Sequence, residues 1–154
     1  MLAVRKQGEM VAGEKKYGPR RPGHRFLDHT GELEVELEAP TAEGLFAEAA
    51  AAVGELLNDG ERPGGERRSW TEICLEAPAR DRLLVDFIEE LVFLAEREGM
   101  VPASAEVSLQ GTELKARVGL IDRPPVPLVK AATLHNLTYV EEPDRVLARV
   151  VLDV

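Results

Sequence analysis

The chain of 154 residues has a single cysteine, Cys74, and aromatic residues make up only 5% of it. One thiol excludes an intrachain disulfide framework and a thiolate metal site, and it favours a reducing compartment. No apolar run approaches the roughly 18 residues needed to cross a membrane. The N-terminus is polar and basic from Arg5 onward, and we expect no apolar signal segment. We therefore expect a cytoplasmic protein with no membrane association and a largely aliphatic core.

Standard catalytic and nucleotide-binding motifs are also missing. The sequence contains no GxGxxG, Walker A, GxSxG or HExxH pattern, and its three histidines, His24, His29 and His135, lack the spacing of a helical metal pair. Cys74 lies inside an alternating strand pattern, where a small side chain needs no chemical role. The carboxylates within residues 81–98 are typical of the solvated face of a helix, and no pattern encloses them in a cleft.

Charge is distributed unevenly along the chain, whose net charge is −9. Residues 1–25 contain seven Lys or Arg and two Asp or Glu, a net +5, whereas residues 26–154 contain twelve against twenty-six, a net −14. A folded body of that sign repels a phosphate backbone, so we expect no stable nucleic-acid binding by the body itself. It should instead attract basic protein surfaces or cations.

Residues 1–24 are rich in glycine, proline, lysine and arginine and show no clean hydrophobic period. This composition predicts a flexible basic N-terminal arm, followed by one domain over residues 25–154. The arm is either an ordinary frayed terminus or a segment that touches RNA, and the composition is compatible with both.

The domain alternates between strand and helix patterns. Residues 33–39 place Leu33, Val35, Leu37 and Ala39 on one face and glutamates on the other, which predicts a half-buried strand. Apolar residues at helical spacing predict helices over 41–58 and 80–98, and further alternation predicts strands over 69–77, 103–110, 114–120, 128–140 and 145–154. The order β-α-β-α-β-β-β-β indicates an α+β fold with two helices packed on one face of a largely antiparallel sheet.

Two polar clusters lie at the ends of predicted strands. The first is the run Asp28-His29-Thr30-Gly31-Glu32, which combines two carboxylates, an imidazole and a hydroxyl just before the first strand. The second is Asp153-Val154, where the sequence stops inside a strand and the terminal carboxylate lies one residue from an aspartate. Neighbouring anionic oxygens repel each other unless a cation or a donor lies between them. Such hard oxygen ligands suit Ca²⁺ or Mg²⁺.

A third candidate is the segment Val129 to His135, which contains a lysine and a histidine in a predicted strand. If that strand is regular, Lys130 and His135 face opposite sides of the sheet, and Lys130 shares a face with Ala132 and Leu134. Lys130 is then either a functional cation or an edge lysine that discourages strand pairing.

Six motifs follow one another along residues 25–154. They are Phe26-Leu27-Asp28-His29-Thr30-Gly31-Glu32, an acidic and alanine-rich helix over 41–58, Leu83-Leu84-Val85-Asp86-Phe87, a hairpin strand from Gly111 to Arg117, the segment Val129 to His135, and Asp153-Val154. No single motif is decisive, but in order and spacing they resemble the archease family.

The resemblance implies an accessory protein rather than an enzyme. Archeases assist the GTP-dependent RNA ligase of tRNA splicing and RNA repair by promoting its guanylylation and its multiple turnover. The resemblance also implies a divalent cation, commonly calcium with Mg²⁺ or Mn²⁺ as alternatives, and no nucleotide held by this chain alone. The positions matching the metal site are Glu32, Asp153 and Val154, the last through its terminal or main-chain oxygen. Those matching the part that reaches the partner are Lys130, Asp28, His29 and His135.

This sequence departs from the family pattern at the end of its first motif. The family reads His-Thr-Ala-Asp, whereas Gly31 and Glu32 occupy the last two positions here. The longer side chain moves the carboxylate by about one C–C bond, ~1.5 Å, which Ca²⁺ tolerates better than Mg²⁺ does. Two other functions are compatible with the residues. One is a stand-alone metal-dependent phosphoesterase using Asp28, His29, Glu32 and Asp153, and the other is a protein-binding module without metal.

Overall fold

The computed structural model describes residues 21–154, so most of the predicted arm, 1–24, lies outside the described residues. Within that range the chain forms two helices and seven strands, and the α+β class is confirmed. The elements are β1 (Gly23–His29), β2 (Glu32–Ala39), α1 (Ala42–Leu57), β3 (Ser69–Glu76), α2 (Arg80–Glu98), β4 (Val101–Gln110), β5 (Glu113–Ile121), β6 (Ala131–Glu142) and β7 (Arg145–Asp153). From β2 onward they follow the predicted order.

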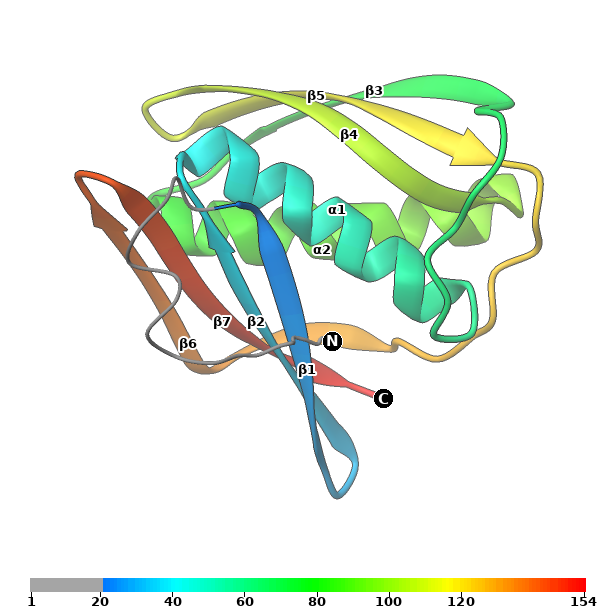
Figure 1. Cartoon of the computed structure of the whole chain (residues 1–154), viewed down its shortest axis with the longest axis horizontal. Helices are drawn as coiled ribbons and strands as arrows, with labels where there is room; N and C mark the ends of the chain where they lie inside the picture. Colours follow the sequence, from blue (N-terminus) through cyan, green and yellow to red (C-terminus); the bar gives the residue numbers. More distant parts are fainter. Residues whose placement is uncertain (1–20) are drawn as a thin grey trace.

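The strands form two antiparallel sheets rather than the single one expected (Figure 1). One sheet has the order β1-β2-β7-β6 and the other the order β3-β5-β4. Helix α1 contacts β4 on one side and β2 and β7 on the other, while α2 contacts β6 on one side and β3 and β4 on the other. The helices are therefore a middle layer, and the proline-rich segment 122–127 carries the chain from one sheet to the other.

Strand β1 was not among the predicted elements. Its residues, GHRFLDH, do not alternate cleanly in burial, because both Phe26 and Leu27 are half-buried. It is an edge strand that pairs with β2 alone, so it needs less apolar surface than a central strand. The turn between the two strands contains Gly31 at φ +73°, a left-handed conformation that glycine adopts without strain.

The core lies between the sheets and is aliphatic with two central phenylalanines. Phe46 of α1 and Phe87 of α2 are fully buried, and their ring centroids are 6.0 Å apart. Helix α1 begins at the N-cap Thr41, whose hydroxyl accepts a hydrogen bond of 3.1 Å from the Gly44 amide. Helix α2 ends at Gly99 in the left-handed conformation, as its position predicts.

Helix α1 packs against β4 backbone to backbone at one point. A Cβ atom on Gly54 would lie 2.3 Å from the carbonyl oxygen of Pro102 and 3.4 Å from the Cα of Ala103. No side chain fits this space, so the helix approaches the strand more closely than any other residue at position 54 would allow.

We expect Gly54→Ala to lower the free energy of unfolding by about 1–3 kcal/mol, the usual result of overpacking. In most helices the same change stabilises by roughly 0.5–1 kcal/mol, so the sign itself tests the close approach. Urea denaturation would measure it. Gly44→Ala in the same helix is the matched control, because the nearest atom to its added Cβ is the Thr41 hydroxyl at 3.1 Å, which needs to shift by only a few tenths of an ångström and can keep its N-cap hydrogen bond. Equal stability of the two variants would contradict the proposed packing.

Candidate functional site

One row of paired residues crosses the four-stranded sheet at its end. His29 of β1 lies opposite Glu32 of β2, Glu32 lies opposite Asp153 of β7, and Asp153 lies opposite Ala131 of β6. Directly opposed residues of antiparallel strands point to the same face of the sheet. The structure therefore brings His29, Glu32 and Asp153 together on one face, although they come from three strands.

That face is the outer one, away from the helices. The apolar residues of β2, such as Leu33, Val35 and Leu37, are buried against the core, so the alternate glutamates point outward. Three of these four glutamates have arginine partners from neighbouring strands. The pairs are Arg25 with Glu36, Arg149 with Glu36 at 3.0 Å and with Glu34 at 2.9 Å, and Arg145 with Glu38 at 4.0 Å.

Glu32 is the exception among the glutamates of β2. Its neighbour across the ladder is another carboxylate, Asp153, and neither forms a hydrogen bond or an ion pair with any side chain in residues 21–154. Like charges directly opposite each other on a sheet destabilise it. Two unpaired carboxylates on adjacent strands supply oxygen donors of the kind that a hard divalent cation prefers.

The main chain around Asp153 is held on both sides. The amide of Lys130 donates a hydrogen bond of 2.8 Å to the carbonyl oxygen of Asp153, and the amide of Val154 donates one of 3.4 Å to the carbonyl oxygen of Gly31. Lys130 therefore lies beside Asp153, with its side chain exposed. These bonds fix the backbone that presents the Asp153 carboxylate and the main-chain oxygen of Val154.

Two other predicted residues lie elsewhere. Asp28 is opposite Leu33, so its side chain belongs to the other face of the sheet from Glu32. The expectation that Lys130 and His135 face opposite sides required a regular strand, and this condition fails. Strand β6 begins at Ala131, after Lys130, and its register shifts between Thr133 and Thr138. His135 lies in this irregular part with an exposed side chain, and its amide donates a hydrogen bond of 3.3 Å to the Thr133 hydroxyl.

In the described part of the chain, the close charged neighbour of His29 is Glu34. The Nε2 of His29 lies 3.8 Å from Oε1 of Glu34, the same glutamate that Arg149 contacts. Across residues 21–154, no three side chains of His, Cys, Asp and Glu are grouped closely enough to hold a metal ion by themselves. Any cation at this row would need main-chain oxygens or a partner's groups in addition to Glu32 and Asp153.

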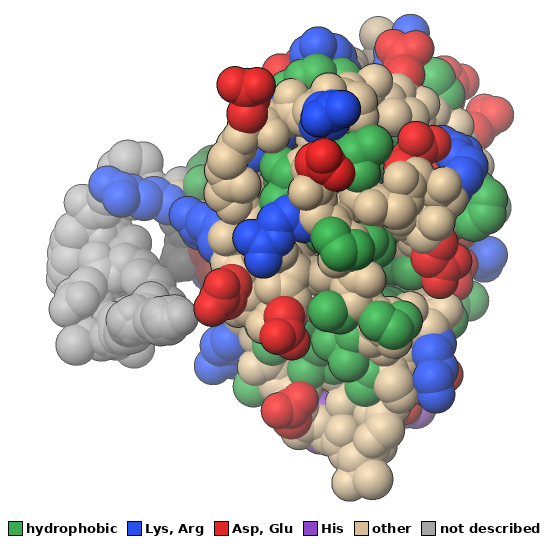
Figure 2. Space-filling model, turned by 90° about the vertical axis from the view of Figure 1, so that its right-hand side faces the viewer, with side chains coloured by type: hydrophobic (Ala, Val, Ile, Leu, Met, Phe, Trp, Pro, Cys, Tyr) green, Lys and Arg blue, Asp and Glu red, His purple; other side chains and the backbone are tan. Residues whose placement is uncertain are grey.

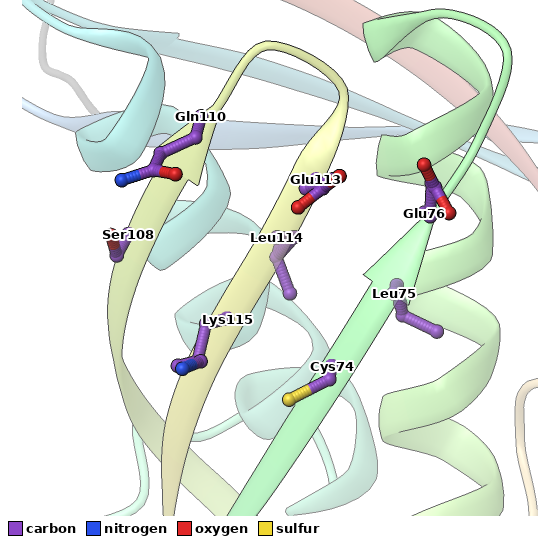
Figure 3. A pocket seen from close by; sticks show the side chains of 8 residues that line it. All are labelled: Cys74, Leu75, Glu76, Ser108, Gln110, Glu113, Leu114 and Lys115. Carbon is purple, nitrogen blue, oxygen red and sulfur yellow. The ribbon is translucent and has the colours of Figure 1, made fainter.

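A hollow of about 460 Å³ lies on the other sheet (Figure 3). Two rows of outward-facing residues line it, one with Cys74, Lys115 and Ser108 and the other with Glu76, Glu113 and Gln110. Its volume suits a small ligand, but none of Asp28, His29, Glu32 and Asp153 reaches it. The hollow therefore does not enclose the residues that a stand-alone phosphoesterase would use.

Sequence reasoning missed the arginines that accompany the glutamates of β2. Their signal is present, because Arg145, Arg149 and Asp153 recur at even spacing along one strand and must share a face. This spacing identifies partners for the glutamates of β2 only once β7 is known to pair with β2. On the face shown in Figure 2, acidic and basic side chains are likewise interspersed and form no basic stripe.

A family model of the Archease protein family (MTH1598/TM1083) matches residues 24–154. The chain belongs to the archease family. It is 28% identical over 141 residues to the protein archease of Methanosarcina barkeri, covering 85% of this chain and 95% of that one. It is 32% identical over 142 residues to the protein archease of Methanopyrus kandleri, covering 82% and 96%.

Two solved structures share the archease fold. The solution structure of protein 1598 from Methanobacterium thermoautotrophicum superposes with a TM-score of 0.66 at 22% identity, covering 86% of this chain and 99% of that one. The crystal structure of an archease from Thermotoga maritima, described as a possible chaperone, gives a TM-score of 0.61 at 21% identity, covering 90% and 99%. In residues 21–154 of this archease, neither helix has the length and apolar character to span a membrane.

The opposed carboxylates lead to a prediction about stability. In buffer with a chelator, Glu32→Gln should raise the free energy of unfolding by about 0.2–1 kcal/mol, because it removes a like-charge pair. Glu36→Gln on the same strand is the control, since it removes pairs with Arg25 and Arg149 and should be neutral or destabilising. Urea denaturation at neutral pH measures both variants. Destabilisation of Glu32→Gln to the same extent as Glu36→Gln would show that the two carboxylates do not repel.

Proposed function

We propose that this archease activates a GTP-dependent RNA ligase, promoting its guanylylation and multiple turnover in tRNA splicing or RNA repair. It acts as an accessory protein and performs no nucleotidyl transfer itself. The proposal combines family membership with the exposed row at the end of the four-stranded sheet. We place this activity in the cytoplasm, where an exposed free thiol such as Cys74 stays reduced.

The observation that supports the proposal is that the carboxylates of Glu32 and Asp153 lie on directly opposed residues and have no cationic side chain as a partner within residues 21–154. Every other outward glutamate of β2 is neutralised by an arginine, so the negative charge is concentrated at one end of the sheet. The main-chain amide of Lys130 is bonded to the carbonyl oxygen of Asp153, and the Lys130 side chain is exposed. A partner's active site that contains metals and phosphates could engage both charges, the carboxylates through a cation and the lysine through a phosphate or carboxylate.

A divalent cation fits the residues present at this row. Glu32, Asp153 and the main-chain oxygen of Val154 would hold it, with calcium favoured and Mg²⁺ or Mn²⁺ as alternatives. Oxygen donors alone suit these ions, and the flexible coordination of Ca²⁺ accommodates a glutamate in place of an aspartate. When bound, the cation would offset phosphate charge at the guanylylation site of the ligase.

Electrostatics favour a protein partner over a nucleic acid. Residues 26–154 carry a net charge of −14, which opposes direct RNA binding but matches the basic channel that an RNA ligase requires. Asp28, His29 and His135 are exposed. His29 belongs to the row, Asp28 lies on the other face of the sheet and His135 lies in the irregular part of β6, and we propose that all three contact the ligase.

The ligase proposal predicts a loss of stimulation when the row is neutralised. Asp153→Asn should reduce stimulation of ligase turnover by tenfold or more while leaving the fold intact, because it removes half of the carboxylate pair. A turnover assay with the ligase of the same organism measures it. Glu113→Gln is the control, since it removes an exposed carboxylate from the other sheet. Failure of the wild-type protein to stimulate fresh ligase would refute the proposed function itself.

The cation proposal has an independent readout in stability. Ca²⁺ at a hundredfold excess over its dissociation constant should stabilise the wild type by about 2.7 kcal/mol, seen as a higher melting temperature. Glu32→Gln should abolish the shift, and Glu113→Gln should retain it. If the wild type shows no shift but still stimulates the ligase, the protein acts as a metal-free binding module instead.

A further inference from the structure

His24 bridges the edge strand β1 to helix α1 through two carboxylates. Its Nδ1 lies 2.5 Å from Oε2 of Glu48, and its Nε2 lies 3.0 Å from Oε1 of Glu55. The side chain of His24 is only 9% exposed, and those of the two glutamates are 13% and 24% exposed. Glu48 and Glu55 are seven residues apart and so lie on one side of the helix. The imidazole therefore fills the space between them.

Both contacts require a doubly protonated ring. A neutral imidazole donates from one nitrogen only, so its other lone pair would face a carboxylate. Burial by itself lowers the pKa of His24, but hydrogen bonding and charge from Glu48, reinforced by Glu55, outweigh it and raise the pKa above its usual value. The arrangement is thus an imidazolium held by two carboxylates at a semi-buried contact.

Within residues 21–154, the other neighbours of His24 do not supply charge. Leu37 lies opposite it on β2, and the Phe26 ring lies 5.1 Å from its own ring on β1. Among residues 21–154, no lysine or arginine forms an ion pair with Glu48 or Glu55. Loss of the His24 proton would therefore leave two poorly solvated carboxylates beside a neutral ring, without another described cation to compensate.

Strand β1 depends on this bridge more than a central strand would. It pairs with β2 alone, and its main contact with the helix layer is with α1. Its other ionic contact near this end, Arg25 with Glu36, lies on the outer face, where Arg25 is well exposed, and such pairs contribute little. His24 is accordingly the polar contact that joins β1 to the middle layer.

We propose that His24 is a protonation-controlled anchor that docks strand β1 onto helix α1 and loosens it when the imidazole loses its second proton. This conformational device is independent of the ligase and of any cation. Loosening would leave β2 as the edge of the sheet. It would also free the segment that leads through His29 into the turn before Glu32.

The direction of the pH dependence follows from the raised pKa. The folded state holds the proton more tightly than the unfolded chain, whose histidine titrates near 6.5. The stabilisation is therefore complete below about pH 6.5 and is lost as pH rises through the higher pKa of folded His24. Strand β1 should therefore be docked below about pH 6.5 and become looser as the pH rises through the raised pKa of His24.

Hydrogen–deuterium exchange tests the anchor. After correction for intrinsic exchange at each pH, protection of β1 amides should fall by up to about tenfold per pH unit through the titration, while that of central β7 amides changes less. His24→Gln should give low protection that does not vary with pH. His29→Gln should keep the pH dependence, because His29 is on the same strand but more than half exposed.

Two results would overturn the proposal. One is protection of β1 amides that does not change with pH in the wild type, and the other is a loss of protection with rising pH in His24→Gln as large as in the wild type. Glu48→Gln provides a second test should His24→Gln fail to fold. Removing that carboxylate lowers the pKa of His24, so the fall in protection should begin at a lower pH. A fall at the wild-type pH in Glu48→Gln would equally refute the anchor.

Discussion

The antiparallel pairing of β2 with β7 is the constraint on which the rest of the molecule depends. Leu33 lies opposite Leu152 and Val35 lies opposite Val150, and all four are buried against the helix layer. A slip of one residue would turn the side chains that either strand buries against the helix layer toward solvent. Burial therefore determines the register, and the register places Glu32 opposite Asp153. Apolar burial thus places two like charges opposite each other, although this arrangement by itself is unfavourable.

Because the buried core sets the register, the row of His29, Glu32 and Asp153 can be exposed and still have a defined geometry. The core supplies the stabilisation and the arginines neutralise the neighbouring glutamates, so the remaining charge is confined to a short stretch of the sheet end. Main-chain hydrogen bonds from Lys130 and Val154 hold that stretch from both sides. A partner would therefore meet a preorganised pair of carboxylates, and little ordering entropy would remain to be lost on binding.

Local patterns were sufficient to predict most elements, because alternation and helical spacing report burial directly. They could not predict how the strands are divided between two sheets, because a strand with one buried face has the same alternating pattern in either sheet. Strand β1 was not predicted, because the consecutive residues Phe26 and Leu27 are both apolar and half-buried and so break the alternating pattern of a strand. The proximity of Glu32 and Asp153, 121 positions apart in the numbering, came from family resemblance. His24 was placed in the arm, so its bridge to Glu48 and Glu55 was not foreseen.

The irregular part of β6 has a consequence for association between molecules. Residues 134–137 of this edge strand stand opposite the single residue Val150 of β7, and Asn136 adopts a left-handed conformation at φ 55°. A strand from another copy could not follow this edge with continuous hydrogen bonds, because the ladder is interrupted in its middle. This strand edge thus obstructs edge-to-edge aggregation, although Leu134 and Val140 of the same strand are exposed.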